Sequence, residues 1–135
     1  MRGPKGLALF REATMSCGCT NGQKRLIYAC SGAANTGLLA DQVARRLTLM
    51  GEGKMTCLAG VGAALDGFLK AAVHAEQNLV IDGCPMACGR KVFERYDLPH
   101  IALDLTTFGV EKGVTVIDEG VIARVTEAVA AGGKA

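Results

Sequence analysis

The amino-acid sequence predicts an α/β fold, a three-layer sandwich with a mostly parallel, doubly wound sheet of about four or five strands. Short apolar runs alternate with longer segments in which apolar residues recur at steps of three and four. Strands that alternate with helices pair in parallel through right-handed crossovers, so helices cover both faces of the sheet. The core should be aliphatic, because half of the residues are hydrophobic, few are aromatic and none is Trp.

The first half of the expected domain carries two strand–helix units. Residues 25–30 form an apolar run typical of a buried strand, and a loop of small residues over 31–37 leads into an amphipathic helix over 38–50. A second strand is expected over 54–58, followed by a flexible loop and a helix over 63–76. The apolar residues expected on the inner side of that helix are Leu65, Phe68, Leu69, Ala72 and Val73.

The second half continues the alternation. A third strand over 78–82 ends at an Asp-Gly turn, and Pro85 suits the first position of a third helix, which ends near Asp97. With Pro85 there, a helical turn would bring Cys84 and Cys88 onto one face. The remaining expected elements are a strand over 101–105, an edge strand over 114–117, and a helix capped by Asp118 that runs to about Val129.

The chain divides into a flexible N-terminal arm over 1–24, a single α/β domain over 25–131 and a tail over 132–135. The net charge of +2 is spread without a basic run, which argues against nucleic-acid binding. No secretory signal and no apolar run long enough to cross a bilayer is evident. A cytoplasmic location is therefore expected, where thiols stay reduced.

The cysteines are the most informative residues, and the chain has six of them. The segment from Asp82 to Gly89 carries Cys84 and Cys88 where the third strand is expected to end. Cys30 closes the first strand, and Cys57 lies near the end of the second. Because neighbouring strand ends lie about 5 Å apart per step, we expect the sulfur atoms to converge at the carboxyl edge of the sheet.

Such a convergence predicts a metal site. Four thiolates suit a tetrahedral Zn²⁺ site, and an iron–sulfur cluster is an alternative for the same ligands. Taken alone, Cys57 is better explained as a small core residue, so the prediction depends on the coincidence of four positions. Cys17 and Cys19, in the expected arm, either lend ligands, form a separate redox or metal pair, or have no role.

A thiol enzyme is the other hypothesis, with Cys30 or Cys84 as the nucleophile of a redox or sulfur-transfer reaction. Both residues precede an expected helix N-terminus, which favours the thiolate. The loop over 31–37 also resembles the anion cradle of low-molecular-weight phosphatases and arsenate reductases. Those families place an Arg in the loop, and this loop has none, which argues against phosphoryl transfer.

The residues beside the cysteines have expected supporting roles. Asp82 should accept hydrogen bonds from the turn that follows it, either in support of a metal site or as an ordinary turn residue. Gly83 and Gly89 should allow tight backbone packing near the sulfur atoms, where N–H groups can hydrogen bond to sulfur. His74 and His100 are expected to lie away from the site.

Several blocks of sequence together resemble the DGC-domain family, small bacterial and archaeal proteins to which zinc binding is attributed. The blocks are Cys30-Ser31-Gly32 with Asn35-Thr36-Gly37, Cys57-Leu58-Ala59-Gly60, and Asp82-Gly83-Cys84-Pro85 with Cys88. The resemblance runs from about Leu26 to about Lys112. It implies that Cys30, Cys57, Cys84 and Cys88 are the metal ligands, and it implies no reaction.

Overall fold

A computed structural model describes residues 25–132 of the chain. The expected arm, with Cys17 and Cys19, and residues 133–135 of the expected tail lie outside the described residues. Within the described part, no helix combines the length and the apolar character that a membrane span requires.

A four-stranded, all-parallel sheet forms the centre of the molecule, in the order β2-β1-β3-β4. The strands are β1 (Arg25–Ala29), β2 (Lys54–Met55), β3 (Gln77–Asp82) and β4 (Ile101–Asp104). β1 and β3 pair along their length, from Arg25 opposite Gln77 to Ala29 opposite Ile81. The α/β prediction is confirmed, and the carboxyl ends of all four strands lie at the same edge of the sheet.

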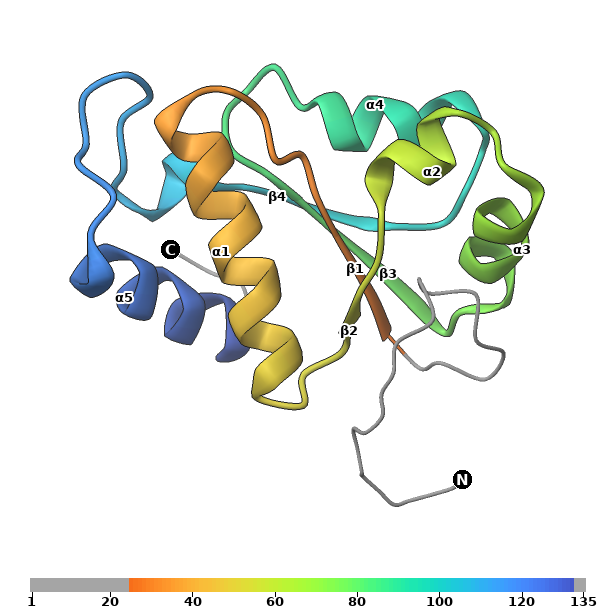
Figure 1. The fold of residues 1–135 in the computed structure, drawn as a ribbon, viewed down its shortest axis with the longest axis horizontal. Helices are drawn as coiled ribbons and strands as arrows, with labels where there is room; N and C mark the ends of the chain where they lie inside the picture. The colour runs from red at the N-terminus through yellow and green to blue at the C-terminus, as the bar shows by residue number, and fades with distance from the viewer. Residues whose placement is uncertain (1–24, 133–135) are drawn as a thin grey trace.

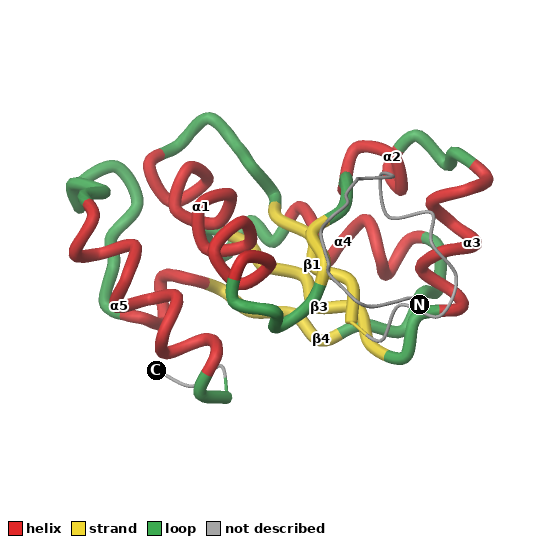
Figure 2. The backbone as a smooth tube through the Cα atoms, turned by 60° about the horizontal axis from the view of Figure 1, so that its bottom comes forward, coloured by secondary structure: helices red, strands yellow, loops and turns green. Residues whose placement is uncertain are grey.

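Helices cover both faces of this sheet (Figures 1 and 2). The helices are α1 (Asn35–Leu49), α2 (Leu58–Gly62), α3 (Asp66–His74), α4 (Cys88–Arg95) and α5 (Glu119–Ala130), with a 3₁₀ turn η1 (Leu105–Phe108) after β4. Helices α1 and α5 lie on one face, and α2, α3 and α4 lie on the other. Alternate residues of β1 supply the two cores: Ile27 and Ala29 face α1 and α5, whereas Leu26 and Tyr28 face the other helices.

The expected helix over 63–76 begins later, as α3 at Asp66, and a separate short helix, α2, precedes it. Ala64 adopts a left-handed conformation with φ of +58°, which ends α2 before α3 begins. Residues expected to form a flexible loop are helical instead, because Val61 is fully buried and Gly60 packs against the Phe68 ring. Leu65, expected on the inner side, is 52% exposed, and Val73 is 60% exposed.

The expected edge strand over 114–117 does not form, because local contacts use its backbone groups. The amides of Val114 and Thr115 donate to the carbonyl of Glu111, which makes a turn. The Asn35 side chain at the start of α1 donates to the carbonyl of Thr115 at 2.8 Å and accepts from the amide of Gly113 at 2.7 Å. Asn35 thus ties this turn to the carboxyl edge of the sheet. The final helix begins as predicted, with Asp118 accepting from the amide of Val121.

Candidate functional site

The carboxyl edge of the sheet carries a cysteine after each of three neighbouring strands. Cys30 directly follows β1, Cys57 comes two residues after β2, and Cys84 comes two residues after β3. Since β1 lies between β2 and β3, Cys30 is the central residue of the three. Cys88 is the first residue of α4, which follows the Cys84 turn. The loops after β1 and β3 and helix α2 all lie in the upper part of Figure 1.

The sulfur of Cys30 contacts the Asp-Gly-Cys segment directly. The Gly83 amide donates a hydrogen bond to Cys30 Sγ at 3.3 Å, while the Cys30 amide donates to the carbonyl of Ile81. The predicted N–H···S contact near the cysteines is therefore present, and Gly83 supplies it.

Close backbone packing holds the loops at this edge together, and glycine is needed for it. A Cβ on Gly83 would lie 2.5 Å from the carbonyl carbon and oxygen of Thr36, in the first turn of α1. A Cβ on Gly37 would lie 2.3 Å from the carbonyl oxygen of Gly32. No real Cβ tolerates such distances, so glycine lets the loop after β1 and the loop after β3 touch through their main chains.

Asp82 joins the end of β3 to the start of α4. Its buried carboxylate accepts a hydrogen bond from the amide of Gly89 at 2.7 Å and another from the amide of Arg90 at 3.0 Å. These amides belong to the first turn of the helix, which otherwise lacks partners for its N–H groups. The predicted capping role of Asp82 is confirmed. A Cβ on Gly89 would lie 2.8 Å from Asp82 Oδ1, so the small residue keeps the carboxylate close.

Pro85 does not begin the helix as predicted. It lies in a turn that the Ala87 amide closes by donating to the carbonyl of Cys84 at 3.0 Å. Ala87 then takes a left-handed conformation, with φ of +53°, and the helix begins at Cys88. Cys84 and Cys88 therefore do not belong to one helical turn. The prediction that a helical turn places both on one face is wrong.

Two residues next to the cysteines are strained. Ser31 follows Cys30 with φ of +49°, and Ala87, with its left-handed conformation, precedes Cys88. A left-handed non-glycine residue costs on the order of 1–3 kcal/mol and persists where the surroundings impose it. Such residues are concentrated at functional sites, which favours a role for this edge of the sheet.

The four thiols share this edge but differ in exposure. All four are free; Cys30 and Cys84 are half-buried, and Cys57 and Cys88 are exposed. Within residues 25–132, no three Cys, His, Asp or Glu side chains are gathered closely enough to hold a metal ion. The soft sulfur donors fit a thiophilic metal by their chemistry. The predicted four-cysteine ligand set remains a prediction.

A cavity of about 560 Å³ opens beside two of these thiols, between the end of β1, α1 and the segment from β2 to α2. Its lining comprises Ala29, Cys30, Ser31, Asp41, Arg45, Met55, Thr56, Cys57, Leu58, Ala59, Gly62 and Val92. The chain leaves the sheet soon after Met55, and this short second strand leaves the cavity open beside β1.

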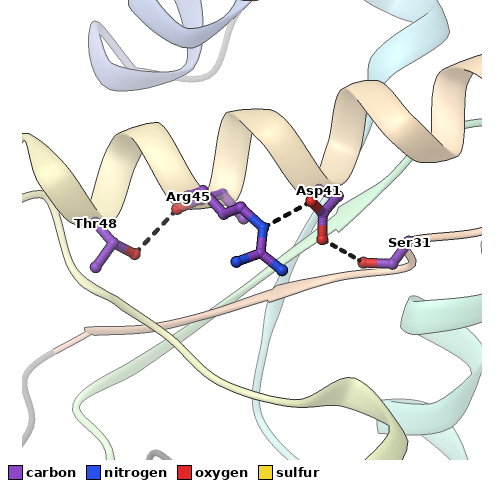
Figure 3. A network of polar contacts seen from close by, with 5 residues as sticks. Ser31, Asp41, Arg45 and Thr48 are labelled. Carbon is purple, nitrogen blue, oxygen red and sulfur yellow. Dashed lines mark hydrogen bonds and ion pairs between the residues drawn. The ribbon is translucent and has the colours of Figure 1, made fainter. Parts of the chain in front are cut away.

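A polar network lines one wall of this cavity (Figure 3). Asp41 Oδ2 accepts a hydrogen bond from Arg45 Nε at 2.7 Å, and Asp41 Oδ1 accepts one from the Ser31 hydroxyl at 3.1 Å. The charge and hydrogen bond of Asp41 raise the pKa of Arg45. Neither residue was predicted from the sequence, because an Asp and an Arg four apart on a helix also form ordinary surface pairs.

The two histidines contact neither this cavity nor the cysteines in the structure. His74 Nδ1 lies 2.8 Å from the carbonyl of Lys70 at the end of α3. His100 lies before β4, near the carbonyl of Leu98, with its ring 5.6 Å from the Phe93 ring. Their predicted distance from the site is consistent with these positions.

Comparison with known proteins identifies related sequences. The sequence profile of the DGC domain matches residues 26–129. The anaerobic and virulence modulator AnvM of Pseudomonas aeruginosa is 35% identical over 88 residues, which cover 64% of this chain and 67% of that protein. No solved structure matches the chain.

Proposed function

The chain belongs to the DGC-domain family, and from that premise we propose that it binds a thiophilic metal ion, with Zn²⁺ as the first choice. The proposed ligands are Cys30, Cys57, Cys84 and Cys88. The observation that carries the proposal is the position of a cysteine after each of three neighbouring parallel strands. Thiolates prefer Zn²⁺ or iron–sulfur clusters over the hard cations.

The residues around the thiols support this proposal. Gly83 donates its amide to the sulfur of Cys30, and this contact holds that sulfur at the edge of the sheet. Asp82 anchors the first turn of α4 and so positions Cys88 at the same edge. The exposed side chains of Cys57 and Cys88 have room to rotate toward the ion. A bound ion would supply a cross-link between loops that are remote in sequence.

Metal content after anaerobic, reducing purification tests the proposal. We expect about one equivalent of zinc per chain, as a single four-thiolate site requires. Cys84→Ser or Cys88→Ser should each remove most of it, whereas the double change of Cys17 and Cys19 to Ser is the matched control and should leave it unchanged. A folded chain that binds no metal, or equal zinc content in all variants, would contradict the proposal.

A thiol enzyme is the second candidate, favoured by the N–H···S contact at Cys30 and the strained Ser31 beside it. In that case Cys30 should be alkylated faster than the other thiols at neutral pH in metal-free, folded protein. An iron–sulfur cluster would instead give visible absorption in the anaerobic sample. A cytoplasmic location, where thiols stay reduced, is part of this proposal.

AnvM bears on the biological setting of the proposal. Its name, anaerobic and virulence modulator, describes a regulatory role. A sensory use of the metal or thiols in this chain would agree with that role. The name assigns no metal, substrate or partner to AnvM, so the metal proposal depends on the cysteines and on the family.

A further inference from the structure

The cavity beside Cys30 and Cys57 has the features of a ligand site in its own right. Its volume of about 560 Å³ falls in the range of small-molecule pockets. Met55, Leu58 and Val92 supply an apolar part of the wall, and Arg45 and Asp41 supply the charged part. The lining shares Cys30 and Cys57 with the proposed metal site but includes neither Cys84 nor Cys88.

The guanidinium of Arg45, whose side chain is 61% exposed, is anchored through Nε. Its Nε bonds to Asp41, whose other oxygen accepts the Ser31 hydroxyl, so both oxygens of that carboxylate are engaged. Figure 3 shows the two terminal nitrogens of Arg45 turned away from α1 toward the strands. Among residues 25–132, the hydrogen bonds and ion pairs of Arg45 involve Nε alone. The two terminal nitrogens keep the paired donors that a carboxylate fits.

Cys57 lies within electrostatic reach of this guanidinium. Both residues line the same cavity, and both also line a neighbouring groove with Thr48 and Leu49. Asp41 is the main cause of the raised pKa of Arg45, and Cys57 contributes in the same direction by less than desolvation opposes it. A ligand held by Arg45 would therefore lie beside the Cys57 sulfur.

We propose that this cavity binds a small organic carboxylate. The terminal nitrogens of Arg45 would bind the carboxylate group. The apolar body of the ligand would lie toward Met55 and Val92, with its far end beside Cys57. Asp41 is a positioning residue, because it holds the guanidinium and touches no ligand. The apolar wall distinguishes an organic acid from an inorganic oxyanion, for which it offers no contact.

Paired alkylating reagents test the proposal on the full chain after chelator treatment and reduction. Iodoacetate carries the carboxylate, and iodoacetamide is its neutral counterpart. We expect the iodoacetate-to-iodoacetamide rate ratio at Cys57 to exceed that at Cys88, which is also exposed, by about tenfold, which corresponds to about 1.4 kcal/mol. Mass spectrometry of each modified peptide measures both rates.

The neighbouring arginine provides a matched control. Arg45→Gln should lower the ratio at Cys57 to that at Cys88, whereas Arg46→Gln should leave it unchanged, because Arg46 pairs with Glu119 instead. Equal ratios at the two cysteines, or an unchanged ratio in Arg45→Gln, would overturn the proposal. Zinc content in Arg45→Gln should match the unchanged chain, so this test fails or succeeds apart from the metal proposal.

A titration monitored by NMR keeps the test independent of thiol reactivity. Butyrate should shift the Nε–H signal of Arg45 and the amide signal of Cys57, with butyramide giving no comparable shift. No shift with butyrate, or an equal response to inorganic phosphate, would overturn the assignment to an organic carboxylate.

Discussion

Asp82 shows how one side chain controls the geometry of the cysteine edge. Its two oxygens bond separately to the amides of Gly89 and Arg90, and the side chain is buried. Removal of the carboxylate would leave two donors at the start of α4 without their partner. The Asp of the Asp-Gly-Cys motif is therefore a structural cap in this fold, whatever the thiols bind.

The change Asp82→Ala should lower the free energy of unfolding by about 3 kcal/mol, because buried donors lose charged acceptors. Asp118→Ala is the control, since Asp118 caps α5 from an exposed position through the Val121 amide. Loss of that exposed cap should cost about 1 kcal/mol. Urea unfolding followed by circular dichroism measures both variants. Equal losses would show that the buried position of Asp82 contributes nothing extra.

At the scale of elements, the cysteine edge is a contact between two loops. The loop after β1 and the segment after β3 meet where Gly83 lies against the carbonyl of Thr36. The Gly83 amide also reaches the Cys30 sulfur from this position. Strand order alone therefore does not explain this contact. The two segments touch because their main chains pack closely.

Gly83→Ala tests this contact. The added methyl would lie 2.5 Å from main-chain atoms of Thr36, so the loops must separate, at a cost of about 2–3 kcal/mol. Gly32→Ala is the matched control, because a Cβ there meets nothing within 4 Å. Thermal unfolding should show a clear loss for Gly83→Ala and little change for Gly32→Ala. A similar small effect in both would contradict the proposed close packing.

The sequence predicted most elements but not their junctions. The four strands of the sheet, the α1 and α5 helices and the Asp82 cap follow from apolar patterns and local chemistry, whereas the expected strand over 114–117 does not form. The break at Ala64 and the turn at Pro85 do not, because both depend on left-handed residues that no local pattern marks. Helix α2 forms because Gly60 packs against Phe68, a tertiary contact that outweighs the poor helix propensity of glycine.

The sequence was sufficient to predict which edge of the sheet carries the candidate site. Cys30, Cys57 and Cys84 lie at neighbouring strand ends, as the alternation of elements indicated. The cavity wall formed by Asp41 and Arg45 was not predictable from the sequence. These residues line a cavity only because β2 is short and ends beside α1. That arrangement is a property of the folded chain.

At the scale of the whole molecule, the sheet separates two apolar cores. Tyr28 lies in the core beneath α4, fully buried, with its ring 4.7 Å from the Phe93 ring in a T-shaped contact. Within the described residues, its hydroxyl has no hydrogen-bond partner. Burial raises the pKa of Tyr28 well above its ordinary value of 10.0. At alkaline pH the folded chain therefore keeps the Tyr28 proton, whereas the unfolded chain releases it.

The stability of the whole domain should consequently fall as the pH rises above about 10, because unfolding then releases the Tyr28 proton. Tyr28→Phe removes both this dependence and the unpaired hydroxyl while it keeps the ring contact. It should raise the free energy of unfolding by about 1 kcal/mol at pH 7, and by more at pH 10.5. Urea titrations at the two pH values provide the measurement. A constant difference between the two proteins would exclude Tyr28 as the source of alkaline sensitivity.

The brevity of β2 also bears on how the folded chain meets other copies of itself. An open sheet has unpaired main-chain groups along its edge strands, and a strand of another molecule can pair with these groups. Here one border has only the two residues Lys54 and Met55, and the opposite border ends after four residues in η1. Such short borders provide little template for intermolecular strand pairing, so the native fold should resist aggregation through its sheet.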